Sequence, residues 1–255
     1  GSEMCIRDRN MRLNKYLSDA GICSRREADR LVQEGKILVD GKAAVLGMQI
    51  AEGQEILVNG KAVRREEKKV LLLFYKPRGI ECTANPKIKN NVISYIDYPI
   101  RIYYIGRLDK DSEGLLLLTN QGELVNKMMR AGNCHEKEYL VTVDKPVTED
   151  FIKKMSNGVP VLGTVTRKCR VEKTGEKTFR IILTQGLNRQ IRRMCEYLGY
   201  RVKRLKRIRV MNLELGDLPV GQYREADKKE LEDLKSLIQD SSETTVIRKN
   251  ERRKR

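Results

Sequence analysis

The chain lacks the residues and patterns on which several common enzyme classes depend. Its 255 residues include one histidine, His135, and six cysteines without any Cys-x-x-Cys spacing. One histidine argues against a Ser-His-Asp triad, a Cys-His dyad and a multi-histidine metal site. The cysteine pattern argues against a zinc site or a disulfide scaffold. Catalysis by this chain, if any, must therefore rest on other side chains.

Long apolar runs are also missing. No stretch approaches the roughly 20 apolar residues that cross a bilayer, and no signal-peptide core is present. Scattered cysteines fit a reducing compartment. We therefore expect a cytoplasmic, monomeric protein with no membrane partner. Gly1 and Ser2 resemble a cloning scar, and the recognisable pattern begins at Met11, so residues 1–10 are expected to be a tag or other non-native extension.

Positive charge is what the chain has in excess. Its 52 Lys and Arg outnumber 35 Asp and Glu, for a formal net charge of +17, so nucleic acid is the first partner to consider. Residues 187–209 carry nine cations and one glutamate, a net +8 in 23 positions. Residues 248–255 carry +5 in eight positions, and we expect residues 241–255 to form a disordered basic arm.

Residues 11–62 have the pattern of a small domain. Apolar residues recur at helical spacing over 13–20, Ser24 is suited to cap a second helix with Glu27 three residues on, and two Gly-containing turns separate short strands. That second helix carries Arg25, Arg26 and Arg30. They could form an ordinary solvated face, but in so basic a chain they favour contacts with RNA phosphates.

The charged stretch 63–69 predicts a linker, and residues 70–240 predict a larger domain. Strands are expected at 70–75, 102–108, 115–119, 139–143, 165–171 and 178–184, and helices at 123–130, 148–157, 191–198 and 227–238. Because strands and helices mix without regular alternation, the sequence predicts an α+β domain with a mainly antiparallel, mixed sheet flanked by helices.

One carboxylate in this domain needs an explanation. Asp109 lies between two apolar runs, where a charge is unusual. A loop aspartate forming an Asx-type turn would account for it, and spacing alone does not exclude that. However, arginines also gather at the start of the helix near residues 188–194. The helix dipole disfavours cations there, so they need a phosphate or a carboxylate, and Asp109 is a natural candidate.

Five motifs carry a resemblance to known families. Residues 12–28 with 39–42 resemble the alpha-L RNA-binding domain. In the second half, the chain is similar to the pseudouridine synthase superfamily, specifically the branch that modifies ribosomal RNA and carries an N-terminal alpha-L domain. The similar segments are Lys76–Gly79, Gly106–Leu116, Lys137–Tyr139 and Gly186–Arg193. The sequences of residues 106–112 and 131–139 are most similar to one particular large-subunit enzyme of that branch.

The resemblance implies roles for individual residues. Asp109 would be the catalytic carboxylate, and Arg192 would keep it ionised, since a close cation lowers a carboxylate pKa by about 1–3 units. Tyr139 would stack on the extruded uracil and assist proton transfer, and Arg107 would fill the vacated place in the RNA. The remaining predicted RNA contacts are Lys76, Arg25, Arg26, Arg30, Arg189 and Arg193.

The reaction implied by the resemblance is an isomerisation. The N1–C1′ bond of a uridine breaks, the uracil turns, and C5 rejoins C1′. No redox change occurs, so no cofactor and no metal are expected. Asp109 could act as a nucleophile on the sugar or as a base that starts glycal formation, and the sequence does not separate the two. The expected substrate is a stem-loop of 23S ribosomal RNA near the peptidyl-transferase centre; whether a transfer RNA is also modified stays open.

Two other functions are compatible with parts of the sequence. A noncatalytic RNA-binding factor for ribosome assembly would explain the charge and the first domain, but not the grouping of Asp109, Tyr139 and Arg192. An RNA methyltransferase would need a glycine-rich loop for its methyl donor, and the sequence has no Gly-x-Gly-x-x-Gly segment.

Overall fold

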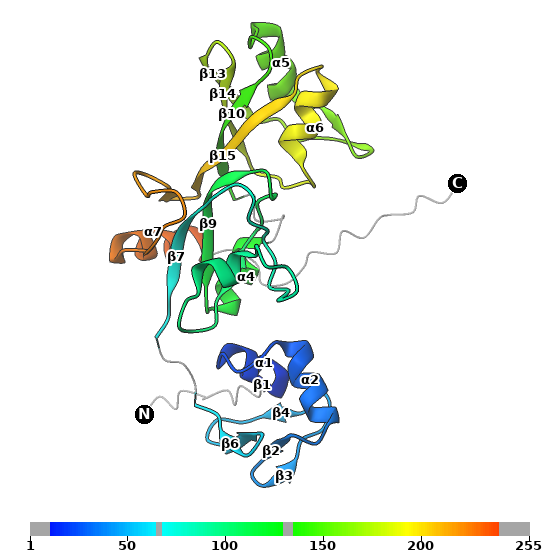
Figure 1. Ribbon diagram of the computed structural model, residues 1–255, viewed down its shortest axis with the longest axis vertical. Helices are drawn as coiled ribbons and strands as arrows, with labels where there is room; N and C mark the ends of the chain where they lie inside the picture. The colour runs from blue at the N-terminus through cyan, green and yellow to red at the C-terminus, as the bar shows by residue number, and fades with distance from the viewer. Residues whose placement is uncertain (1–10, 65–67, 130–134, 240–255) are drawn as a thin grey trace, which may run out of the picture. The chain divides into compact units, whose positions relative to one another are not determined.

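The computed structural model describes residues 11–64, 68–129 and 135–239 (Figure 1). The extension at 1–10, part of the expected linker at 65–67 and the basic tail at 241–255 lie outside the described residues. The chain divides into two compact units. The first consists of the segment up to Lys69 and of a separate short segment, Pro99–Ile102. The second holds Val70–Tyr98 and the chain from Tyr103 onward. In the described part, no helix is long and apolar enough to span a membrane.

The first unit packs two helices against short strands. Helices α1 (Leu13–Asp19) and α2 (Arg25–Gln33) share a core with a four-stranded sheet. Its strands, in spatial order, are β3 (Lys42–Ala43), β2 (Ile37–Val39), β5 (Ile56–Val58) and β6 (Lys61–Ala62), while β1 (Met11–Arg12) pairs with β4 (Gln49–Ile50). The expected helices and turns are therefore confirmed here.

The start of α2 follows from its sequence. The Ser24 hydroxyl accepts a hydrogen bond from the Glu27 N–H at 3.1 Å, which confirms the predicted N-cap. The Glu27 carboxylate accepts from Arg30 Nε at 3.0 Å, and Arg30 also pairs with Glu34 at 3.1 Å. Arg25, Arg26 and Arg30, the predicted phosphate contacts, are all exposed, but Arg30 already has two carboxylate partners, one on α2 and one at its C-cap.

A nine-stranded sheet organises the second unit. Its main path runs β13–β14–β10–β15–β9–β7–β17, with β16 beside β15 and β8 beside β9. The strands are β7 (Leu71–Lys76), β8 (Tyr103–Ile105), β9 (Glu113–Thr119), β10 (Lys137–Val143), β13 (Arg170–Gly175), β14 (Thr178–Leu183), β15 (Val202–Val210), β16 (Leu213–Glu214) and β17 (Tyr223–Glu225). Every pairing is antiparallel except that of β15 with β9. The mainly antiparallel α+β prediction is confirmed.

Helices cover this sheet at two apolar clusters. One cluster joins α5 (Glu149–Asn157) and α6 (Gln190–Tyr197) to β10, β14 and β15; the other joins α4 (Gly122–Met129) and α7 (Lys228–Ile238) to β7 and β9 (Figure 1). The unit also contains α3 (Val92–Ile96) and a hairpin of β11 (Pro160–Val161) and β12 (Thr164–Val165). Thr148 and Asp227 cap α5 and α7, Asp227 with a full capping box.

One strand prediction was wrong, and one long strand was not predicted. The expected strand at 165–171 is replaced by β12 and by β13, which starts only at Arg170. Strand β15 was not expected, because its seven-position run of mostly cations after Val202 hides the period-2 alternation that marks a strand. Its buried residues Leu205, Arg207 and Val210 nevertheless reach the interior.

The parallel contact between β15 and β9 depends on one glycine. Arg207 is paired with Gly114 there, and Gly114 has a φ of +105°. A Cβ atom on Gly114 would lie 2.2 Å from the Arg207 carbonyl oxygen, so a side chain cannot be accommodated without moving a strand. This close approach fixes the loop before β9 next to the cations of β15.

Candidate active site

Asp109 lies on the loop between β8 and β9. The Ser112 N–H donates to the Asp109 carbonyl oxygen at 3.0 Å, which closes a tight turn. That bond uses the backbone of Asp109, so its carboxylate remains available. The carboxylate is one-third exposed, and its ion-pair partner is Arg189, with Nη1 3.4 Å from Oδ2. The turn is therefore closed by the backbone of Asp109 and not by its side chain, and the carboxylate stays available for a ligand.

A second turn supports this loop from below. Lys76 is fully buried, and its Nζ donates to the carbonyl oxygens of Pro77 at 2.8 Å and Ile80 at 2.7 Å. The Gly79 N–H, on the same turn, donates to the Lys110 carbonyl oxygen at 2.7 Å. Burial lowers the pKa of Lys76. The expectation that Lys76 contacts RNA is wrong in this structure, because its ammonium group lies inside the turn that braces the Asp109 loop.

Helix α6 brings two arginines to the loop. Arg189, at the N-cap with a φ of 50°, donates to both carboxylate oxygens of Asp111 at 3.1 and 3.2 Å. Arg192 is less exposed, and its Nη2 lies 3.1 Å from Ser112 Oγ, 3.2 Å from the Asp111 carbonyl oxygen and 3.3 Å from Asp111 Oδ2. Its Nε is buried and without a hydrogen-bond partner among the described residues.

These contacts add a residue to the expectation for Asp109. Arg192 was expected to keep Asp109 ionised, and it does interact with the charge of Asp109, but the ion pair to Asp109 comes from Arg189. The left-handed backbone of Arg189 turns its side chain back towards the loop, which the spacing of the motif does not reveal. Arg192 instead holds Asp111 and Ser112, the residues that follow Asp109. It acts on Asp109 through the loop and through its charge.

The two arginines alter the titration of Asp111. Burial alone would raise the pKa of Asp111, but hydrogen bonds from Arg189 and the charges of both arginines outweigh it and lower that pKa. The bond to Asp111 in turn raises the pKa of Arg189, whereas burial lowers the pKa of Arg192. The loop is therefore held by an ionised carboxylate between two charged guanidinium groups.

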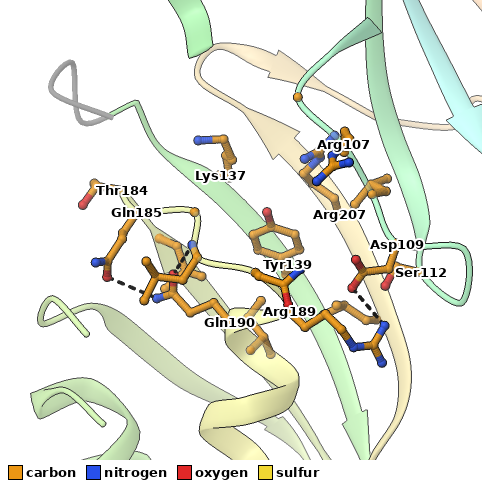
Figure 2. Close-up of a pocket in the computed structure, with 18 of the residues that line it drawn as sticks. Arg107, Asp109, Ser112, Lys137, Tyr139, Thr184, Gln185, Arg189, Gln190 and Arg207 are labelled. Carbon is orange, nitrogen blue, oxygen red and sulfur yellow. Dashed lines mark hydrogen bonds and ion pairs between the residues drawn. The ribbon is translucent and has the colours of Figure 1, made fainter. Parts of the chain in front are cut away.

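Above the loop lies a cavity of about 370 Å³. Asp109 and Tyr139 both line it, Tyr139 from β10, and Figure 2 shows the tyrosine ring and the carboxylate in the same pocket. Tyr139 also packs against the apolar cluster below α6. Its position is therefore fixed, with part of the ring left accessible to a ligand.

A second group of cations lines the same cavity. They are Arg107, which is exposed, and Lys137 and Arg207, which are not. Burial, with a contribution from the charge of Arg207, lowers the pKa of Lys137. Sequence reasoning assigned no role to Lys137, Arg207 or Asp111. Neither the inward direction of Arg207 on β15 nor the bidentate match of Asp111 to Arg189 has a signal in sequence spacing.

The other predicted RNA contacts lie at the surface. Arg193 is bonded to Asn188, with its Nε 3.1 Å from the Asn188 carbonyl oxygen. Arg25 and Arg26 are exposed on α2 in the first unit. Within residues 11–64, 68–129 and 135–239, no group of three or more His, Cys, Asp or Glu side chains could hold a metal ion.

Comparisons with known proteins agree with this site. The family model described as RNA pseudouridylate synthase matches residues 70–197, and the model of the S4 domain matches residues 11–56. The chain therefore belongs to the RNA pseudouridine synthase family: it is an RNA-modifying isomerase with an N-terminal RNA-binding S4 domain.

Particular relatives narrow the position within the family. The dual-specificity RNA pseudouridine synthase RluF of Escherichia coli K12 is 54% identical over 92% of this chain and 82% of the relative. This relative is the particular large-subunit enzyme that residues 106–112 and 131–139 resemble, so that resemblance is confirmed. The ribosomal large subunit pseudouridine synthase B of Bacillus subtilis is 37% identical, over 89% of this chain and 96% of the relative. A crystal structure of a pseudouridylate synthase superposes with a TM-score of 0.65 at 26% identity, covering 88% and 99% of the two chains.

Proposed function

We propose that this chain converts a specific uridine of 23S ribosomal RNA to pseudouridine, in a stem-loop near the peptidyl-transferase centre. The observation that carries the proposal is the pocket, which combines one loop carboxylate, an arginine ion pair and a partly accessible tyrosine. The name of the B relative refers to the large ribosomal subunit, which supports a ribosomal substrate. Such an enzyme would work in the cytoplasm, where ribosomes are assembled.

A second RNA substrate is part of the proposal. The RluF relatives are named as dual-specificity enzymes, which supports two kinds of RNA for this chain too. Transfer RNA is the second class that we propose. The S4 domain at residues 11–62, with the exposed Arg25 and Arg26 on α2, would anchor either RNA by its phosphates, while residues 70–240 carry the chemistry.

The proposed mechanism begins with base flipping. The target uridine must leave its stack before Asp109 can reach C1′, and Tyr139 would hold the extruded uracil by stacking, a contact worth roughly 1–3 kcal/mol. Arg107, exposed at the rim of the pocket, would occupy the vacated place in the RNA. Arg189 and Arg193 would contact the RNA backbone where they are not engaged with protein carboxylates.

Asp109 then starts the isomerisation as an ionised carboxylate. It either attacks C1′ as the N1–C1′ bond breaks, or removes the C2′ proton to give a glycal. In both routes uracil leaves with the electron pair and turns. C5 then bonds to C1′ as the Asp109 carboxylate is displaced from C1′ in the first route, or as Asp109 returns its proton to C2′ in the second. The C5 proton is then lost, with assistance from Tyr139. Arg189 and Arg192 keep the loop in place, and they lower the pKa of Asp111 beside Asp109.

Replacement of Asp109 tests this proposal. We expect Asp109→Asn to fold and bind RNA normally while losing activity by at least about a thousandfold, as removal of a nucleophile does. Tritium release from 23S RNA labelled at uridine C5 measures the reaction. The matched control is Asp217→Asn, an exposed aspartate outside the pocket, which should react like the wild type. Normal release from Asp109→Asn would remove the catalytic assignment.

A further inference from the structure

Arg207 is a buried guanidinium group facing the pocket. It is 2% exposed, and its Nε donates to the Leu115 carbonyl oxygen at 2.7 Å. Its Nη2 is buried and has no hydrogen-bond partner among the described residues. Arg207 lines the cavity together with Asp109 and Tyr139 (Figure 2). A charged donor is thus held at the reaction site with one nitrogen unused.

Burying a charged group with an unpaired donor costs free energy, so Nη2 of Arg207 is expected to have a partner. Buried polar groups are nearly always hydrogen-bonded, and buried charges are nearly always paired. In the part of the chain that the structure describes, no carboxylate lies within ion-pair distance of Arg207, and the nearby Lys137 adds a second positive charge. The partner must therefore come from outside the protein and carry an oxygen that is negative or becomes so.

The position of Arg207 indicates which part of a substrate it would meet. Tyr139 on β10 is the direct neighbour of Arg207 on β15, and the register shift at Glu138 and Tyr139 creates this pairing. Direct cross-strand neighbours have Cβ atoms roughly 4.5–5.5 Å apart. A base stacked on Tyr139 would therefore present an edge to Arg207. A phosphate would instead meet Arg107, which is exposed at the rim.

We propose that Arg207 donates a hydrogen bond to a carbonyl oxygen of the flipped uracil, O2 or O4, and stabilises the uracil anion. This inference rests on the proposed function. When the N1–C1′ bond breaks, its electron pair passes to the uracil and is delocalised onto those oxygens. C5 of the anion then forms the new bond to C1′. Because uracil leaves with the pair in both the nucleophile and the glycal route, Arg207 serves either one.

Two substitutions at Arg207 test the assignment. Arg207→Met keeps the length and removes the charge, and we expect the single-turnover rate at saturating enzyme to fall about 100- to 1000-fold, as when an oxyanion donor is lost. Arg207→Lys keeps a cation and should recover part of that loss. The Kd for the stem-loop RNA should change less than about threefold, and its salt dependence should not change. The matched control, Lys203→Met, removes an exposed charge from the same strand and should leave rate and Kd unchanged.

The outcomes separate the explanations. A folded Arg207→Met protein with a wild-type rate overturns the proposal. So does a raised Kd with a log–log salt slope smaller by about 0.7–0.9, because that result identifies a phosphate contact. If Arg207→Met fails to fold by circular dichroism, Arg207→Gln, which also removes the charge, takes its place: a folded Arg207→Gln protein with a wild-type single-turnover rate overturns the proposal. Failure of the proposed function is distinct, since the wild-type protein itself would then release no tritium.

Discussion

Helix α6 and strand β15 bring arginines to the same pocket but balance their charge differently. Arg189 and Arg192 on α6 are engaged with Asp109, Asp111 and Ser112. Arg207 on β15 has a backbone carbonyl for one nitrogen and no carboxylate among the described residues. The arginines of α6 thus pair with protein groups and hold the loop that carries Asp109. Arg207 on β15 is left with a donor nitrogen that a ligand can use.

This difference divides catalysis into two tasks. Arg189 and Arg192 position Asp109 before RNA binds, since their contacts exist in the free protein. Arg207 acquires a partner for its unpaired nitrogen only when an electron-rich group enters the cavity. An enzyme that breaks a bond to a uracil needs both, because the carboxylate must be charged at the start and the uracil becomes charged in the middle of the reaction.

After the Arg207 substitution, the largest expected effect in this comparison concerns the two arginines of helix α6. Arg192 is 14% exposed in its side chain and Arg189 41%. We expect Arg192→Met to lower the single-turnover rate about 100-fold, because a desolvated donor that positions the Asp109 loop is lost. Arg189→Met should lower it only about fivefold, the value of an exposed ion pair near 1 kcal/mol. Tritium release measures both, and the reverse order would show that the direct ion pair to Asp109 is what matters.

The comparison also shows where sequence reasoning succeeded. The helices α5 and α7 were predicted closely because Thr148 and Asp227 are cap residues with local signals that do not depend on tertiary context. The strands β7 and β9 were predicted because they are buried on both faces and form continuous apolar runs. Asp109 and Tyr139, singled out from the motifs, line one cavity.

What sequence reasoning missed depends on tertiary structure. Strand β15 carries cations on both faces, so its hydrophobic alternation is weak, and the inward direction of Arg207 follows from pairing with β10. The burial of Lys76 depends on the turn that closes around it. Which arginine of α6 reaches Asp109 depends on the left-handed backbone at Arg189. None of these is set by the spacing of residue types along the chain.

Lys76 shows a third way in which this protein satisfies a cation. Its ammonium group donates to two neutral carbonyl oxygens and is shielded from solvent, and no carboxylate of the described residues lies within ion-pair distance of it. We expect Lys76→Met to lower the free energy of unfolding by about 2 kcal/mol, because both carbonyl groups lose their donor. Urea unfolding measures the change. Lys203→Met, which removes an exposed lysine, should stay within about 0.5 kcal/mol, and an equal effect of both substitutions would contradict the structural role of Lys76.

The smallest expected effect is the pH dependence of the stability that Asp111 contributes through its contacts with Arg189 and Arg192. The pKa of Asp111 is lower in the folded protein than in the unfolded chain, where an aspartate titrates near 3.9, so its ionised form contributes stability above that value. The contribution is lost as the pH falls through the folded-state pKa. Because the side chain is 42% exposed, solvent screening limits it to less than about 1 kcal/mol. We expect wild-type protein to be slightly more stable than Asp111→Asn at pH 7, and the gap to narrow below about pH 4. Urea unfolding of both proteins across this range measures it, and a gap that widens in acid would mean that Asp111 stabilises the loop without its charge.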